Sequence, residues 1–138
     1  MTIVGFNFTS INAKRKKQIQ GKISIQNNVK IDEIRESELS VGTSKQKTLV
    51  FDFTYRSDYS PDIGEIVLCG SLIYMAEPEK VSEIMKLWKK EKGKGIPEDI
   101  MAPVLNTVLN KCSITALELS KEINLPPQIQ LPKVKVKE

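Results

Sequence analysis

The chain has 138 residues but no histidine and only two cysteines. Without histidine, the commonest general base and the commonest metal ligand are both missing. Cys69 and Cys112 lie far apart, and neither has a partner at metal-ligand spacing, so both are expected to be buried, reduced thiols. The sequence therefore predicts a protein that is not an enzyme, with no catalytic residues, no metal site and no cofactor.

Long apolar runs are also missing. No stretch approaches the roughly 18 consecutive apolar residues of a membrane-spanning helix, and the N-terminus lacks a signal-like apolar segment. Apolar residues make up 40% of the chain and charged residues 28%, as in ordinary globular proteins. We therefore expect one soluble, cytoplasmic domain over residues 1–138, without a membrane span.

Charge of one sign is not abundant either. The 21 basic and 17 acidic residues leave a net charge of +4, which is weak evidence for nucleic-acid binding. Basic runs occur at residues 14–17 and 86–94, the second around Trp88, but no RNA-binding signature accompanies them. A basic nucleic-acid-binding domain is therefore the less favoured of the alternatives.

What the chain does contain, over about residues 3–76, is a series of strand-like segments. Residues 3–8 predict a strand, and residues 19–36 predict one irregular strand or two short ones, with a turn or bulge at Asn27-Asn28. The polar residues 36–47 predict a connection, and residues 57–62 a loop. Between these two segments four alternating side chains predict a half-buried strand, namely Leu49, Phe51, Phe53 and Tyr55.

The last predicted strand, residues 66–75, is apolar on both faces. Ile66 and Leu68 point to one side, while Val67 and Cys69 point to the other. Such a strand is expected to be covered on both faces. In a chain this small, we expect a partner subunit to contribute one of the covers.

Two helices are predicted after the strands. The first, at about residues 78–92, has a tight apolar stripe that ends at Trp88. The second, long helix is predicted at about residues 103–123, starting at Pro103. Its main apolar stripe consists of Leu105, Val108, Leu109, Cys112, Ala116, Leu119 and Ile123. Ile114 and Leu117 lie on its opposite side, which predicts an oligomer interface there.

An extended segment, residues 124–138, follows the long helix. Asn124 suits the helix C-cap, and the prolines at 126, 127 and 132 favour an extended path. Apolar residues alternate with polar ones from Gln128 onward. We predict that this segment supplies an apolar groove for extended stretches of other chains, an interaction that tolerates many sequences. An edge strand would add backbone hydrogen bonds to such a client.

Two local stretches carry a resemblance to the SecB family of ATP-independent chaperones. Lys111-Cys112-Ser113-Ile114 resembles part of the long family helix, and residues 125–134, Leu-Pro-Pro-Gln-Ile-Gln-Leu-Pro-Lys-Val, resemble the loop that follows it. The resemblance implies an α+β fold with a four-stranded antiparallel sheet in Greek-key-like order, then a short helix and a long packing helix. It also implies a homotetramer, built as a dimer of dimers with the long helices sandwiched between sheets.

The family binds unfolded polypeptides or preproteins in long surface grooves without nucleotide, which implies a holdase function here. The groove is expected to be lined by Leu125, Ile129, Leu131 and Val134, with Tyr55 or Tyr59 from an exposed strand end. An oligomeric adaptor that binds one specific partner through the same surface remains the alternative. Roles in export, in a toxin–antitoxin system and as a general holdase all stay open.

Two departures from the family pattern stand out. The family usually has a second C-terminal helix that helps to wall the groove, and this sequence ends soon after the loop. The acidic sheet surface and metal-binding tail that the family uses to dock on SecA are not evident either. Delivery of clients to SecA is therefore not expected.

Overall fold

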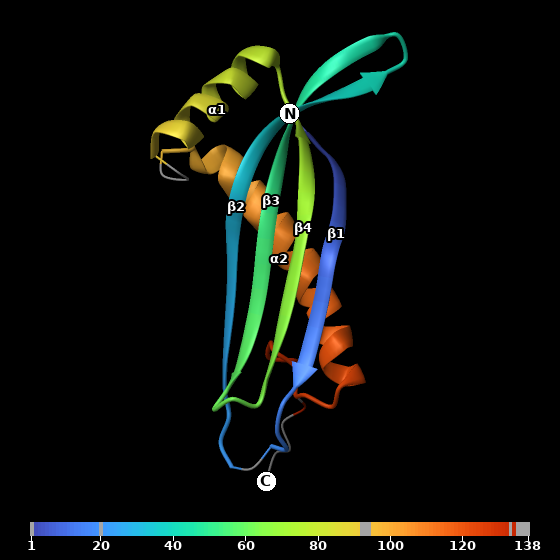
Figure 1. Ribbon diagram of the computed structural model, residues 1–138, viewed down its shortest axis with the longest axis vertical. Coiled ribbons are helices and arrows are strands. Elements are labelled where there is room, and N and C mark those ends of the chain that lie inside the picture. The colour runs from blue at the N-terminus through green and yellow to red at the C-terminus, as the bar shows by residue number, and fades with distance from the viewer. Residues whose placement is uncertain (1, 20, 92–94, 133, 135–138) are drawn as a thin grey trace.

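The computed structural model describes residues 2–19, 21–91, 95–132 and 134. Its elements in chain order are β1 (Thr2–Arg15), β2 (Ser24–Val41), β3 (Ser44–Ser60), β4 (Gly64–Met75), α1 (Pro78–Glu91) and α2 (Glu98–Glu122). The four strands form one antiparallel sheet in the order β1-β4-β3-β2 (Figure 1). Because β2, β3 and β4 follow one another as hairpins and β1 joins at the far edge, the topology is Greek-key-like. The predicted α+β fold class and sheet order are confirmed.

Both helices pack on one face of the sheet, and α2 crosses it diagonally (Figure 1). α2 contacts all four strands, while α1 contacts β2 and β3. The alternation of β3 places Phe51, Phe53 and Tyr55 on this covered face, where each is at most 1% exposed. Leu68 and Leu72 of β4 lie beside them and are also fully buried. The predicted inward face of β3 is therefore confirmed.

On the other face of the sheet, the described residues place no helix. Ion pairs cross it: the Arg35 guanidinium donates two hydrogen bonds, of 2.8 and 3.0 Å, to the Asp52 carboxylate. The same carboxylate accepts a bond of 2.7 Å from Ser71. The bonds from Arg35 hold the pKa of Asp52 below its usual value. Apolar residues such as Val67 and Ile73 are half-buried between these polar groups, and their cover by a partner subunit stays a prediction.

β2 and β3 are longer than predicted. The connection expected at residues 36–47 is wrong, since pairing continues to Val41 and Ser44 around a turn in which Gly42 has φ +63°. Pairing of β3 with β4 begins only at Thr48, so the hairpin projects beyond the sheet (Figure 1). The loop expected at residues 57–62 is partly wrong, because β3 runs to Ser60.

Irregularities in the edge strands also differ from expectation. The bulge in β2 lies between Ile31 and Glu33 rather than at Asn27-Asn28. β1 extends to Arg15 instead of ending at residue 8, with register shifts near Val4 and Thr9. Bulges keep a long edge strand paired with a twisted sheet. The alternation of apolar and polar side chains breaks at each bulge, so the strand predicted from this alternation ended at residue 8.

α2 begins five residues earlier than predicted and contains Pro103. Proline there removes only the hydrogen bond to the carbonyl of Asp99, near the helix start. Ile100 and Val104, both 0% exposed, supply the burial that favours helix across this point. Burial follows steps of four residues, through Ile100, Val104, Val108, Cys112, Ala116 and Ser120. Leu109, expected in the main stripe, is 40% exposed, so its placement was wrong.

By length and composition alone, α2 would qualify as a membrane-crossing helix. Its buried stripe instead packs against the sheet of the same chain. The core helix of a soluble protein passes the same test, so this property is weak evidence for a membrane location. The expected end of α1 at residue 92 lies outside the described part of the chain.

Candidate functional site

The site begins where α2 ends. Asn124 has φ +57°, the left-handed conformation that terminates a helix. Its N–H donates to the carbonyl of Lys121 at 3.3 Å, and the N–H of Leu125 donates to that of Ser120 at 2.8 Å. These two bonds form the Schellman pattern of a helix C-terminus. They turn the chain back, so that residues 124–132, the C-terminal loop, return along α2.

Three hydrogen bonds hold the C-terminal loop to the rest of the molecule. The hydroxyl of Tyr59 on β3 donates to the carbonyl of Pro126 at 2.6 Å. Asn27 Nδ2 on β2 donates to the carbonyl of Gln128 at 2.8 Å, and Gln128 Nε2 donates to the carbonyl of Ser113 on α2 at 2.7 Å. The loop is therefore tied to two strands and to the helix at once.

A buried polar network continues beneath this loop. Ser57 Oγ lies 2.6 Å from Asn27 Oδ1, to which it donates, and 3.0 Å from the hydroxyl of Tyr55. Gln128 is 4% exposed, and its Oε1 has no hydrogen-bond partner within the described part of the chain. Burying a polar group costs free energy unless the group is hydrogen-bonded. The network therefore favours one position of the loop on the sheet and the helix.

Between α2 and the C-terminal loop lies a groove with a volume of about 470 Å³. Its lining consists of Leu117, Glu118, Ser120, Lys121, Leu125, Pro127 and Leu131. Leu117 of α2 forms one apolar wall of the groove, and Leu131 of the C-terminal loop forms the other. We name this feature the loop groove. It has room for one or two side chains of a bound segment.

The loop presents its apolar side chains to solvent and buries a polar one. Ile129 is 39% exposed and Leu131 45% exposed, whereas Gln128 is 4% exposed. Val134, beyond the loop, is 94% exposed, and Leu125 is buried at 5%. Of the four apolar residues predicted for client binding, Leu125 and Leu131 line the loop groove, while Ile129 and Val134 stand outside it.

Tyr55 and Tyr59 do not lie at an exposed strand end, and that expectation was wrong. They are 0% and 1% exposed because the C-terminal loop and α2 cover the strand to its end. Their hydroxyls belong to the hydrogen bonds under the loop. In this structure they support the groove from below and have no open surface on which to meet a client.

The two residues predicted at an oligomer interface lie on different surfaces of α2. Ile114 is 61% exposed on α2, whereas Leu117 lines the loop groove. Sequence reasoning did not single out Asn27 and Gln128, which position the loop. Gln128 was counted only among the polar residues of an alternating segment, and no sequence pattern indicated that its side chain is buried.

Burial raises the pKa of Tyr59 to about 12, and the neighbouring Tyr55 contributes in the same direction. The protonated form is thus favoured in the folded state. The raised pKa of Tyr59 stabilises the folded protein fully below pH 10. This stabilisation falls as pH rises towards 12, because the tyrosine of the unfolded chain loses its proton first. We expect the stability difference between wild type and Tyr59→Phe to shrink by roughly 2 kcal/mol over that interval.

Urea unfolding at several pH values between 8 and 12 measures this difference. Wild type and Tyr59→Phe share every other titratable group, so the comparison isolates this tyrosine. A difference that stays constant with pH would show that Tyr59 ionises as easily in the folded protein as in the unfolded chain.

No protein-family model matches the chain, and no curated protein matches its sequence. Among solved structures it is similar to a Mycobacterium tuberculosis protein, Rv1957, described as a SecB-like chaperone in complex with a ChAD peptide from the Rv1956 HigA1 antitoxin. The TM-score is 0.54 at 9% identity, over 99% of this chain and 92% of that one. The chain has a SecB-like fold. The SecB-like fold expected from the helix and loop motifs is therefore confirmed, and at this identity the likeness extends to the fold alone.

On this SecB-like fold, the site offers noncovalent contacts. Glu118 and Lys121 are the titratable side chains that line the loop groove. Within the described ranges, no three Cys, Asp or Glu side chains gather as metal ligands. What the groove supplies is apolar area with few fixed hydrogen-bond donors or acceptors, which suits binding of apolar segments with varied sequences.

Proposed function

We propose that this protein is an ATP-independent, cytoplasmic holdase that binds unfolded polypeptides or preproteins. Extended apolar segments of the client occupy the loop groove and continue over the exposed apolar side chains of the C-terminal loop. The observation that carries the proposal is the inverted loop: Ile129 and Leu131 face solvent while Gln128 is buried. A loop selected only for stability would place these side chains the other way round.

The rigid seating of the loop supports the same proposal. Side chains of β2 and β3 donate hydrogen bonds to the loop backbone, and Gln128 donates one to α2, so exposing Ile129 and Leu131 does not require the loop to be loose. A preformed apolar surface binds with a smaller entropic penalty than one that must first be ordered. The SecB-like fold agrees with this role, since the similar mycobacterial protein is a chaperone.

A second candidate function is an adaptor that binds one specific partner. It is favoured by the similar mycobacterial protein, whose structure holds a peptide from an antitoxin. The two functions differ in selectivity. A holdase suppresses aggregation of several unrelated unfolded proteins, whereas an adaptor suppresses none and binds one segment tightly.

Leu131→Asp is expected to weaken binding of an unfolded client roughly 10- to 100-fold, because it removes the apolar contact of one leucine and places a charge in the loop groove. Leu131 is 45% exposed, so the free energy of unfolding should change by less than about 1 kcal/mol. The measurement is suppression of aggregation of two unrelated reduced, unfolded proteins, without nucleotide, together with urea unfolding of the variant.

Gln130→Asp is the matched control, since it adds the same charge to an exposed neighbour that does not line the groove. It should retain client binding. If wild type suppresses no aggregation, or if both variants bind clients equally well, the holdase proposal is wrong. Tight binding of one segment without general suppression would favour the adaptor.

We also propose that the protein is a homo-oligomer, a tetramer built from two dimers. The outer edge of β1 supports this proposal, because Thr2 to Ala13 contain no charged side chain and include Val4 and Ile11, 43% and 53% exposed. Soluble proteins usually protect such an edge with charges. The edge of β2 is protected in this way, by Lys30, Asp32, Glu33, Arg35, Glu36 and Glu38.

Ile114→Lys is expected to lower the oligomeric state, because a charge on the most exposed apolar side chain of α2 would have to be buried between subunits. Light scattering with size exclusion measures the solution mass. Ser82→Lys, an exposed change on α1, should leave the mass unchanged. If the Ile114→Lys protein has the wild-type mass, Ile114 does not lie in the interface between subunits.

A further inference from the structure

The strongest concentration of one charge lies where β1 leads into β2. Residues 14–17 are Lys-Arg-Lys-Lys and Lys22 follows, with no acidic residue among residues 14–22. These five cations exceed the net charge of +4 of the whole chain, so the remaining residues carry a net charge of −1 (4 minus 5). All five side chains are exposed, and so is Ile19. We name this group the basic end, and it consists of Lys14, Arg15, Lys16, Lys17, Ile19 and Lys22.

Backbone contacts hold the basic end against the sheet. The pairing of β1 with β4 continues to Arg15. The N–H groups of Lys16 and Lys17 then donate to the carbonyl of Ile63, in the turn between β3 and β4, at 2.6 and 3.3 Å. In Figure 1 the connection from β1 to β2 forms one tip of the elongated molecule, opposite the tip formed by the projecting hairpin. The cations therefore gather at one end of the fold.

The carboxylates at this end of the sheet are fewer than the cations and are already paired. Lys16 binds Asp62 at 3.2 Å. Asp58 and Glu65 both bind the guanidinium of Arg56. Together with the basic end, these residues comprise six cations and three carboxylates, a net charge of +3 (6 minus 3). The other four cations of the basic end make no ion pair within the described ranges. This end consequently attracts anions.

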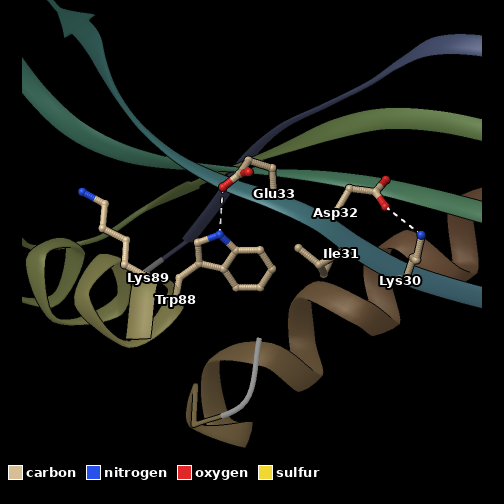
Figure 2. A pocket seen from close by; sticks show the side chains of 6 residues that line it. All are labelled: Lys30, Ile31, Asp32, Glu33, Trp88 and Lys89. Carbon is tan, nitrogen blue, oxygen red and sulfur yellow. Dashed lines mark hydrogen bonds and ion pairs between the residues drawn. The ribbon is translucent and has the colours of Figure 1, made fainter. Parts of the chain in front are cut away.

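The second basic run, on α1, lies beside carboxylates. Figure 2 shows Lys89 at a pocket of about 480 Å³ whose lining also includes Lys30, Asp32 and Glu33. The two cations and two carboxylates of that lining cancel, and Glu33 also accepts a hydrogen bond of 2.8 Å from Trp88. The lysines of α1 therefore provide a comparison surface, whose neighbouring pocket carries no excess of positive charge.

Ile19 indicates which kind of anion fits the basic end. Its side chain is 40% exposed, between Lys17 and Lys22 in the chain. Cations of a polybasic segment are attracted to anionic headgroups, while an exposed aliphatic side chain can enter the membrane interface. Single-stranded nucleic acids are instead held by aromatic side chains on which bases stack. Residues 14–22 contain no aromatic residue. The composition thus favours a lipid surface over a nucleic acid.

We propose that the basic end is a docking site for an anionic lipid bilayer. The contact is peripheral and reversible, because a few cations and one aliphatic side chain do not anchor a protein permanently. Arg15 and Leu125 flank the same glycine, since a Cβ on Gly64 would lie 3.4 Å from Cα of Arg15 and 3.1 Å from Leu125. Docking would therefore bring the start of the C-terminal loop close to the bilayer. The proposal does not rest on the holdase function, because no residue of the basic end lines the loop groove.

Co-sedimentation with large vesicles tests the docking site. The probe is a vesicle of one part phosphatidylglycerol to two parts phosphatidylcholine, compared with a vesicle of phosphatidylcholine alone. Wild type should bind the anionic vesicles at low salt, leave them as salt rises and ignore the neutral vesicles. The triple variant Arg15→Gln, Lys17→Gln, Lys22→Gln should lower binding roughly 100-fold, at about fivefold per cation. Ile19→Ser should lower binding roughly threefold at every salt concentration, because apolar contact is not screened.

The matched control is the triple variant Lys86→Gln, Lys89→Gln, Lys90→Gln, which removes the same charge from exposed positions of α1. It should bind anionic vesicles like wild type. Equal loss in the two triple variants would show that net charge alone drives binding and would overturn the site. Wild type that ignores anionic vesicles would also overturn it.

A short DNA duplex at the same salt concentrations is the second probe. Binding of the duplex without binding of vesicles would replace the bilayer by a nucleic acid and overturn the proposal. All substituted side chains of the basic end are exposed, so urea unfolding of these variants should match that of wild type. Leu131→Asp should bind vesicles like wild type even if it loses unfolded clients, so failure of this proposal is distinguishable from failure of the holdase proposal.

Discussion

Replacing Gly70 by alanine is expected to destabilise the protein by about 3 kcal/mol or more and to loosen β1 from the sheet. A Cβ at this position would clash with the carbonyl oxygen of Asn7 and would lie 2.7 Å from the ring of Phe53. The first contact is with backbone and cannot be relieved by a rotamer change. Gly70 pairs with Phe8 on one side and with Phe53 on the other, so the rings fill the space above it.

Urea unfolding measures the loss of stability, and hydrogen exchange of the β1 amides shows whether that strand separates first. Gly5→Ala is the matched control on the same pair of strands. Its Cβ would approach only the flexible side chain of Ile73, at 3.1 Å, so a much smaller loss is expected. Equal stabilities for Gly70→Ala and wild type would contradict the close approach of β1 and β4.

Leu125→Asp is expected to detach the C-terminal loop, to destabilise the protein by about 3 kcal/mol or more and to abolish client binding. Leu125 is 5% exposed and packs against Gly64 of β4. A carboxylate at this buried position would lose its hydration in an apolar contact, and charge burial is among the most costly substitutions. With the anchor lost, both walls of the loop groove move apart.

Comparing Leu125→Asp with Leu131→Asp distinguishes a buried residue that anchors the loop from an exposed residue that binds clients, because both changes place the same charge in the same loop. Urea unfolding and limited proteolysis of the loop are the measurements. Leu125→Asp should unfold earlier and be cut within the loop, while Leu131→Asp should resist both. If the two variants unfold alike, the distinction between a buried anchor and an exposed binding residue is wrong.

Where periodicity was regular, the sequence was a good guide to the fold. The alternation from Leu49 to Tyr55 predicted the covered face of β3, and the apolar residues 66–75 predicted a strand where β4 is found. The end of α2 and the extended path after Asn124 were also predictable, because helix termination depends on local backbone chemistry.

Prediction ended early where local pattern was weak. The hairpin through residues 36–47 is polar, and its strands pair through backbone bonds that leave no hydrophobic signature. Pro103 suggested a helix start, but burial of Ile100 and Val104 extended α2 across it. The hairpin is held by backbone bonds between adjacent segments, whereas α2 is extended by packing on strands that are distant in sequence.

The candidate site shows the same division. The amino-acid sequence by itself determined that the segment after α2 is extended and rich in apolar side chains. Tertiary structure decided which of those side chains are free. The backbone carbonyl of Gln128 accepts a hydrogen bond from Asn27, and its Nε2 donates one to the carbonyl of Ser113. This seating buries Gln128 and turns Ile129 and Leu131 outward. Exposure depends on which partners the fold brings to each residue, and those partners lie on three elements far apart in the sequence.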